Sequence, residues 1–154
     1  MIKVQQKDFN YSLEVAALSE GNHDVGGVCA FSGLVRDLVG DKHIDYMTLE
    51  HYPGMTEKCL AEIEAEAHHR WPLEKTLIIH RYGRLEPGDQ IVLVAVSSVH
   101  REAAFDACRF LIDFLKTNAP FWKLECTGGD SKWVTAKDTD TQACDRWLNG
   151  DKKE

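Results

Sequence analysis

The sequence predicts a single α+β domain, and three observations lead to that fold class. Segments with strand-like and helix-like patterns follow one another without strict β-α-β alternation. The chain has 154 residues, the size of one common domain, and shows no internal repeat or low-complexity segment. Its 44% hydrophobic content is enough for a core, and its 28% charged content argues against disorder. We therefore expect one domain over residues 1–148 and a short polar tail over 149–154.

The first part of the chain predicts two strands around a short helix. Ile2 to Gln5 is a candidate strand, and Tyr11 to Leu18 has helical apolar spacing, with Asn10 or Ser12 as the N-cap. The run VCAFSGLVR, residues 28–36, predicts a buried strand that a glycine interrupts.

The next segments predict a loop, a strand and a helix. Residues 37–43 are typical of a loop, and YMTLEH, residues 46–51, is typical of a strand. After a Pro-Gly turn, Thr56 is a candidate cap for a helix over about 57–71. That helix ends before Pro72, because proline cannot continue it.

A hairpin and a long helix follow. The runs 76–85 and 90–99 are strand-like, and the tight Pro-Gly-Asp turn between them predicts antiparallel pairing. Residues 102–117 have the spacing of an amphipathic helix, which Pro120 ends. The remaining expected elements are an extended segment over 121–126, a short strand at Trp133–Val134 and a last helix over about 139–148.

The charge and the N-terminus narrow the function classes. The net charge is −7 and the pI is about 5.5, which opposes a general role on nucleic acid or anionic membranes. This charge does not exclude a small local anion site. The first 15 residues hold no apolar signal-peptide region, and no apolar run approaches the roughly 18 residues of a membrane span. We expect a soluble, intracellular protein located in the cytoplasm.

The cysteines favour neither a disulfide framework nor a structural zinc site. The chain has five, an odd number, and no CxxC pair. Cys29 and Cys108 lie in apolar contexts and are expected in the core. Cys126 is a candidate nucleophile, although no histidine base stands near it in the sequence.

Two lysines around an aromatic turn give the clearest chemical signal, in FLKTNAPFWKLE, residues 114–125. The simplest interpretation pairs Lys116 with the dipole of a helix C-terminus and turns Lys123 outward on a strand, between buried Trp122 and Leu124. The alternative brings both ammonium groups to one rim, against an apolar wall of Phe121 and Trp122. Such a wall lowers the pKa of a lysine and suits proton transfer. Glu125 either orients a lysine or faces solvent.

Other cationic residues and histidines are candidates for binding an anion or a metal, and each also has a simpler structural explanation. His100-Arg101 precedes a helix, where an anion is favoured, but the pair is equally compatible with a solvated helix start. Arg36 alone is typical of a charge at the end of a strand. The adjacent His68 and His69 point about 100° apart on a helix and rarely share one metal. The histidines at 51 and 80 are expected to be partly buried and hydrogen-bonded.

Five sequence blocks together resemble the large, catalytic subunit of the molybdopterin synthase family. Their order and spacing match along roughly residues 1–148, and the KTxAPFWK block and the His-Arg after a strand are the most specific. The blocks are LEHYPGM (49–55), RWPL (70–73), IHRYGRLEPGD (79–89), SSVHR (97–101) and FLKTNAPFWKLE (114–125).

The resemblance implies a sulfurtransferase of molybdenum cofactor biosynthesis. Its members convert cyclic pyranopterin monophosphate (precursor Z) to the molybdopterin dithiolene. The sulfur comes from a small ubiquitin-like subunit whose C-terminal glycine carries a thiocarboxylate. Two large subunits form a central dimer with one small subunit at each end, a heterotetramer. The implied fold is an α/β hammerhead with an additional antiparallel β-sheet, and the resemblance implies neither a metal nor a cofactor.

The resemblance also implies roles for particular residues. It makes Lys116 and Lys123 catalytic: Lys116 stabilises the anion formed during sulfur transfer or acts as acid or base, and Lys123 holds the thiocarboxylate. The implied substrate-binding residues are Leu34, Val35, Arg36, His100, Arg101, Lys116, Lys123, Leu124 and Glu125.

Two positions depart from the family pattern. Lys137 stands where relatives carry an arginine that reaches the neighbouring subunit's site, and it lacks the arginine's forked donors. Many relatives carry a polar pair after Arg36, where this chain has Asp37-Leu38-Val39, which puts the role of the 37–43 loop in doubt.

Two other classes compete with this reading. A binding module would use the lysines only to dock an acidic C-terminal tail. A cysteine-based sulfurtransferase would use Cys126, and the absence of a glycine-rich loop around any cysteine weighs against it.

Overall fold

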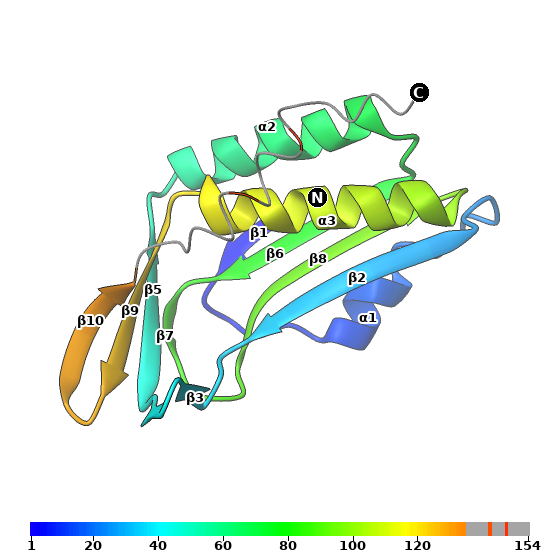
Figure 1. Ribbon diagram of the computed structural model, residues 1–154. Helices are drawn as coiled ribbons and strands as arrows, with labels where there is room; N and C mark the ends of the chain where they lie inside the picture. Colours follow the sequence, from blue (N-terminus) through cyan, green and yellow to red (C-terminus); the bar gives the residue numbers. More distant parts are fainter. Residues whose placement is uncertain (135–141, 143–146, 148–154) are drawn as a thin grey trace.

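A four-stranded mixed sheet, in the order β1-β6-β8-β2, carries the helices of this fold (Figure 1). The computed structural model describes residues 1–134, 142 and 147. The parallel pair in the sheet is β1 with β6, and the other pairs are antiparallel. The strands are β1 (Ile2–Gln5), β6 (Lys75–Arg81), β8 (Gln90–Ser98) and β2 (Gly27–Leu34).

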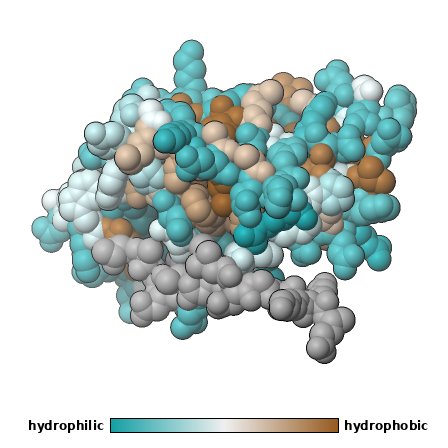
Figure 2. Space-filling view, turned by 90° about the horizontal axis from the view of Figure 1, so that it is seen from above, coloured by the Kyte–Doolittle hydropathy of each residue, from teal (hydrophilic) through white to brown (hydrophobic). Residues whose placement is uncertain are grey.

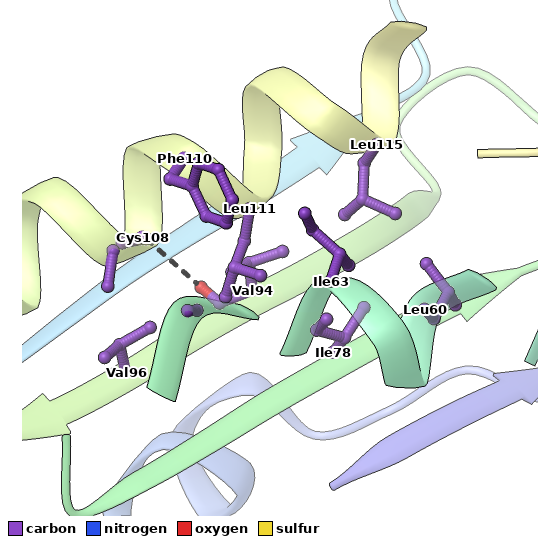
Figure 3. Close-up of a cluster of buried hydrophobic side chains, with 11 residues drawn as sticks. Leu60, Ile63, Ile78, Val94, Val96, Cys108, Phe110, Leu111 and Leu115 are labelled. Carbon is purple, nitrogen blue, oxygen red and sulfur yellow. Dashed lines mark hydrogen bonds between the residues drawn. The ribbon is translucent and has the colours of Figure 1, made fainter. Parts of the chain in front are cut away.

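The two long helices, α2 (Met55–Arg70) and α3 (Arg101–Thr117), cover one face of this sheet, and the short α1 (Tyr11–Ala16) lies on the other (Figure 1). Between the helices and the sheet, side chains of α2, α3, β6 and β8 form the main core (Figure 3). Along β8, Val94 and Val96 contribute to this core, while Leu93 and Ala95 pack in a second cluster on the α1 side. Because both faces of β8 are covered, its sequence is an almost continuous apolar run.

A second sheet, in the order β10-β9-β5-β7, is entirely antiparallel. It stands beside the end of the first sheet (Figure 1). A small hairpin of β3 (Leu38–Val39) and β4 (Lys42–His43) precedes β5. The strands of the second sheet are β10 (Asp130–Val134), β9 (Phe121–Thr127), β5 (Tyr46–His51) and β7 (Gly83–Leu85).

The predicted single strand over 76–85 is wrong, because the chain passes from one sheet to the other within it. β6 ends at Arg81, and β7 begins at Gly83, whose φ of +88° breaks the extended run. The predicted antiparallel hairpin is confirmed for β6 and β8, whereas β7 pairs with β5.

Other predicted elements are confirmed with local corrections. Asn10 is the N-cap of α1, and its side chain accepts from the Leu13 N–H at 3.1 Å. Thr56 is not a cap: Gly54 is the N-cap of α2, and buried Thr56 exchanges hydrogen bonds with the backbone of Tyr52. The loop predicted over 37–43 contains the β3–β4 hairpin. The helix predicted over about 139–148 falls almost entirely outside the described residues.

The strand predicted as buried over 28–36 is instead a partly exposed edge strand, β2 (Gly27–Leu34). Val28 is 38% exposed, Phe31 41% and Leu34 53%, because β8 covers β2 along one side only. The predicted interruption is confirmed as a register shift between Gly33 and Leu34.

The helical side of the molecule has a mixed surface. Seen from above, hydrophilic side chains cover most of this face, and hydrophobic ones gather in patches between them (Figure 2). Among the described helices, none is long and apolar enough to cross a membrane.

Candidate active site

The turn that joins α3 to β9 separates the two lysines. Lys116 lies in the exposed last turn of α3, and Asn118 ends the helix by donating its N–H to the Phe114 carbonyl at 2.8 Å. β9 begins at Phe121, whose N–H donates to the Ala119 carbonyl at 2.8 Å. These backbone hydrogen bonds give the turn between the lysines one defined path.

Lys123 lies on the more buried face of the second sheet. In the β5–β9 register it stands opposite Leu49, and Glu125 stands opposite Met47. Residues directly opposite in an antiparallel pair share a face. Leu49 is 6% exposed and Met47 3%, so this face belongs to the core cluster of the second sheet.

Glu125 orients Lys123, as one of the two sequence interpretations predicted. The Lys123 Nζ lies 2.8 Å from Glu125 Oε1, and the two side chains are 35% and 15% exposed. The ammonium is therefore held by a carboxylate that is mostly shielded from water. Such a pair has less solvent screening than one on an open surface.

The interpretation that turned Lys123 outward between buried Trp122 and Leu124 is wrong. Trp122 is 47% exposed and Leu124 is only half-buried. Of the expected apolar wall, Phe121 shares a face of β9 with Lys123, whereas Trp122 lies on the opposite face. Leu124 pairs with Thr48 and Trp133 on that opposite face.

An aromatic group extends the Lys123 face past Phe121. The Phe121 ring stacks on His80, with ring centroids 3.7 Å apart and planes tilted by 15°. His51, opposite Phe121 in the register, lies 4.5 Å from the Tyr82 ring and 6.2 Å from Phe121, both between centroids. No sequence pattern indicated that these residues meet, because they come from β5, from β9 and from β6 and the residue that follows it.

His80 is hydrogen-bonded, as predicted, and it is buried rather than partly buried. Burial lowers its pKa to about 4, with a small further decrease from His51. Its Nδ1–H donates to the Arg81 carbonyl at 2.9 Å, which opposes the decrease but does not reverse it. The hydrogen bond predicted for His51 is missing at Nδ1, which is buried and has no partner among the described residues.

Arg36 lies next to this sheet. Its neighbour Val35 is 3% exposed and packs in the cluster of Met47, Leu49 and Leu85. The Val35 N–H donates to the Asp89 carbonyl at 2.9 Å, and its carbonyl accepts from Gly88 at 2.8 Å. Val35 thus anchors the exposed Arg36 beside the sheet that carries Lys123.

His100 and Arg101 lie at the start of α3. His100 is the N-cap, and both side chains are exposed. With Gly26, Val99 and Glu102 they line a cavity of about 540 Å³. Glu102 places a carboxylate in the same cavity as Arg101.

One chain does not bring the two cationic groups together. Arg101 is the first residue of α3 and Lys116 is in its last turn, so they are separated by roughly 22 Å at about 1.5 Å of rise per residue. Lys123, Glu125 and Val35–Arg36 therefore lie on or beside the second sheet. Lys116 lies at the end of α3, on the other side of the turn that leads into β9. The structure leaves His100 and Arg101 at the far end of the helix. Lys137 lies outside the described residues.

Cys126 is poorly suited to be a nucleophile. It is 5% exposed, on the opposite face of β9 from Lys123, and opposite Tyr46. The neighbouring Cys126 thiol is the largest cause of a raised Tyr46 pKa. Cys108 is buried as predicted, and burial raises the pKa of its thiol.

Metal binding finds no support in the described part of the chain. No group of three or more His, Cys, Asp or Glu side chains there is arranged to hold a metal ion. His68 instead contacts the Thr76 hydroxyl at 3.2 Å through Nε2.

The fold and the site define a mixed α/β protein that carries a cationic site at a helix–strand junction. The MoaE protein family matches over residues 4–118. A molybdopterin synthase catalytic subunit from Mesorhizobium japonicum is 51% identical over 148 residues, which are 95% of this chain and 92% of the relative. The chain belongs to the MoaE family, and the resemblance found in the sequence is confirmed.

Solved structures agree with this assignment. A MoaE protein from Burkholderia ambifaria superposes with a TM-score of 0.82 at 49% identity, covering 96% of this chain and 97% of that one. A second solved structure, from Helicobacter pylori, is described as a complex of subunits 1 and 2 of molybdopterin-converting factor. One of its chains superposes with a TM-score of 0.72 at 21% identity. That likeness covers 89% of this chain and 90% of the other, and it supports the fold alone.

Proposed function

We propose that this chain is a molybdopterin synthase catalytic subunit that transfers sulfur from a small subunit's C-terminal thiocarboxylate to cyclic pyranopterin monophosphate. Membership of the MoaE family assigns it to molybdenum cofactor biosynthesis as an enzyme of the transferase type. One observation carries the finer proposal: Lys116 and Lys123 flank a hydrogen-bonded turn, and Lys123 is held by Glu125 at 2.8 Å.

The two lysines divide the chemistry. Lys123, on the shielded face of the sheet, attracts the anionic thiocarboxylate and holds it in the site. Lys116, across the turn, stabilises the negative charge that develops as the sulfur bonds to a pterin carbon and displaces an oxygen from it. Water then attacks the tail's acyl carbon, the C–S bond breaks, and the tail is released as a carboxylate. Sulfur arrives on the partner, so the reaction requires no cysteine of this chain.

Arg36 supplies a forked donor for the substrate's phosphate. It follows Val35, which is anchored in the core of the second sheet, so its backbone is fixed while its side chain is exposed. An arginine fork matches a phosphate in a bidentate manner. Leu34 and Leu124 stay proposed as substrate-binding positions because they flank Val35–Arg36 and Lys123 in the chain, although the Leu124 side chain lies on the opposite face of β9 from Lys123.

His100 and Arg101 serve the same site from a second copy of the chain. Their separation from Lys116, roughly 22 Å along α3, excludes a shared pocket within one chain. A two-fold dimer brings the start of α3 of one copy toward the lysines of the other without any change in fold. Lys137 is proposed as a further contact across that interface.

The remaining details follow the family. The small partner is ubiquitin-like and two copies join the central dimer in a heterotetramer. The H. pylori structure of the same fold is described as a complex of subunits 1 and 2 of molybdopterin-converting factor. The α/β hammerhead description of the fold and the cytoplasmic location remain predictions.

The two alternatives make different predictions. The binding-module alternative keeps the docking of the tail but has no turnover. The cysteine alternative is disfavoured by the burial of Cys126 and by its contact with Tyr46.

A reconstituted assay tests the proposal. The purified chain, precursor Z and the thiocarboxylated small subunit are mixed, and molybdopterin is measured as its fluorescent oxidation product. We expect product only with all three components, with a loss for Lys116→Ala and little change for Cys126→Ser. Complex formation without product would instead favour the binding module.

A further inference from the structure

His51 has an unpaired polar atom inside the protein. Its Nδ1 is buried and has no hydrogen-bond partner among the described residues, where Ser32 Oγ is the other such side-chain atom. Buried polar atoms in folded proteins are almost always paired, and an unpaired one costs roughly 1–3 kcal/mol. A serine hydroxyl turns freely to meet a neighbour, whereas an imidazole nitrogen has one fixed direction. The His51 nitrogen therefore calls for a functional explanation.

His51 lies diagonally across from Lys123. It is the last residue of β5 and pairs with Phe121, while Lys123 pairs with Leu49. Diagonal neighbours on one face of an antiparallel pair are roughly 7–8 Å apart, within reach of a long side chain. Lys123 thus stands between Glu125 on one side and Phe121 with His51 on the other.

No neighbour of His51 meets its Nδ1. The Tyr82 ring lies 4.5 Å away between centroids, tilted by 45°, and Phe121 has no polar side-chain atom. The nearby His80 directs its own Nδ1–H to the Arg81 carbonyl. On this face Lys123 and Glu125 lie on β9, while Lys132 and Asp130 lie on β10, on the far side of β9 from His51. Lys123 is therefore the donor nearest to His51 in the strand register.

We propose that His51 is a positioning residue of the sulfur-transfer site, which accepts a hydrogen bond from the Lys123 ammonium when the thiocarboxylate is bound. This inference rests on the proposed function. An ammonium has three N–H donors, and the bond to Glu125 accounts for one. In the occupied site the three donors are shared among Glu125, the anionic tail and His51 Nδ1. With both protein acceptors in place, the ammonium has one direction left, toward the tail.

Two matched substitutions distinguish the role of His51 Nδ1 from that of Nε2. His51→Asn keeps a polar group at the Nδ1 position, and His51→Gln keeps one at the Nε2 position. We expect His51→Asn to retain most of kcat and His51→Gln to lose it roughly tenfold or more, the effect of removing a hydrogen bond to a charged group. The KM for the thiocarboxylated partner should change by less than about threefold, because Glu125 still holds the ammonium. His23→Asn, at an exposed loop position, is the control substitution and should leave both constants unchanged.

Equal rates for the wild type, His51→Asn and His51→Gln would overturn the proposal. An equal loss in both variants together with a lowered Tm would show a purely structural role, and would overturn it as well. If the wild type itself forms no product, the proposed function has failed, and the kinetic comparison no longer applies.

A spectroscopic measurement keeps the inference testable without turnover. In the ¹⁵N spectrum of labelled protein, we expect His51 to be neutral with Nδ1 unprotonated. Adding the thiocarboxylated small subunit should then shift the Nδ1 resonance in the direction of hydrogen-bond acceptance. A protonated Nδ1 in the resting protein, or no shift in a complex known to have formed, would contradict the assignment.

Discussion

The ammonium of Lys123 and the carboxylate of Glu125 lie 2.8 Å apart, two residues along one strand and on its more buried face. The i, i+2 spacing puts both side chains on one side of β9, where buried Met47 and Leu49 stand opposite them. A lysine so placed is oriented before any substrate arrives.

Glu125→Gln removes that orientation with little effect on the fold. We expect kcat to fall roughly 10- to 100-fold, the usual effect of a misplaced catalytic group. The free energy of unfolding should change by about 1 kcal/mol or less, because partly exposed ion pairs contribute little. Initial rates and urea denaturation measure the two effects. A wild-type rate for this variant would show that the ion pair does not serve the reaction.

Two inactive variants should complement each other if the site spans two copies. Lys116→Ala removes the lysine side of a site, and Arg101→Ala removes the part at the start of α3. Random pairing in a mixed dimer regenerates about a quarter of the wild-type sites, because half the dimers are mixed and each holds one intact site. Activity is measured after the two proteins are coexpressed. No recovery, with mixed dimers demonstrated by mass spectrometry, would place both groups in one chain's site.

Gly26 should be intolerant of any side chain. A Cβ there would lie 2.1 Å from the Val99 carbonyl oxygen, a backbone atom just before His100. Gly26→Ala should therefore lower the free energy of unfolding by about 1–3 kcal/mol, a typical cost of overpacking. Gly27→Ala is the control, since its Cβ would meet Arg101 Cα at an ordinary 3.5 Å. Equal stability of the two variants would contradict this account.

Acid should destabilise the protein through His80. Its pKa is about 4 in the fold against 6.5 for an ordinary histidine, so between these values the unfolded chain binds more protons. The stability that neutral His80 contributes is present above about pH 6.5 and is lost as the pH falls toward 4. Compared with His80→Asn, the wild type should lose free energy of unfolding across this window, up to about 3 kcal/mol. Urea unfolding at several pH values measures the difference, and parallel curves would refute it.

Local patterns were enough to predict most elements of the fold. The amphipathic spacing of α3, the Pro-Gly-Asp turn before β8 and Asn10 as a cap depend on neighbouring residues, and all three are confirmed. The passage between sheets at Gly83 was not predictable, because a glycine in a strand-like run is equally compatible with a bulge. The exposure of β2 was also missed, since sheet order depends on contacts distant in sequence.

The candidate site was predictable in part for the same reason. The spacing of Lys116 and Lys123 across a helix end indicated a junction, and Glu125 was a candidate partner for a lysine. The face of Lys123 was predicted wrongly from its apolar neighbours, because Trp122 suggested burial by its size alone. The contact of His51 with Tyr82 depends on the pairing of β5 with β7, which begins directly after Tyr82. No local pattern carries that information.

The most direct test of sulfur transfer at the lysines follows the sulfur atom itself. The small subunit's C-terminus is analysed by mass spectrometry after a single turnover with the enzyme and precursor Z. Our account predicts that the thiocarboxylate becomes a carboxylate only when both are present, and stays intact with Lys116→Ala. An intact thiocarboxylate in the wild-type reaction, or equal loss with Lys116→Ala, would contradict it.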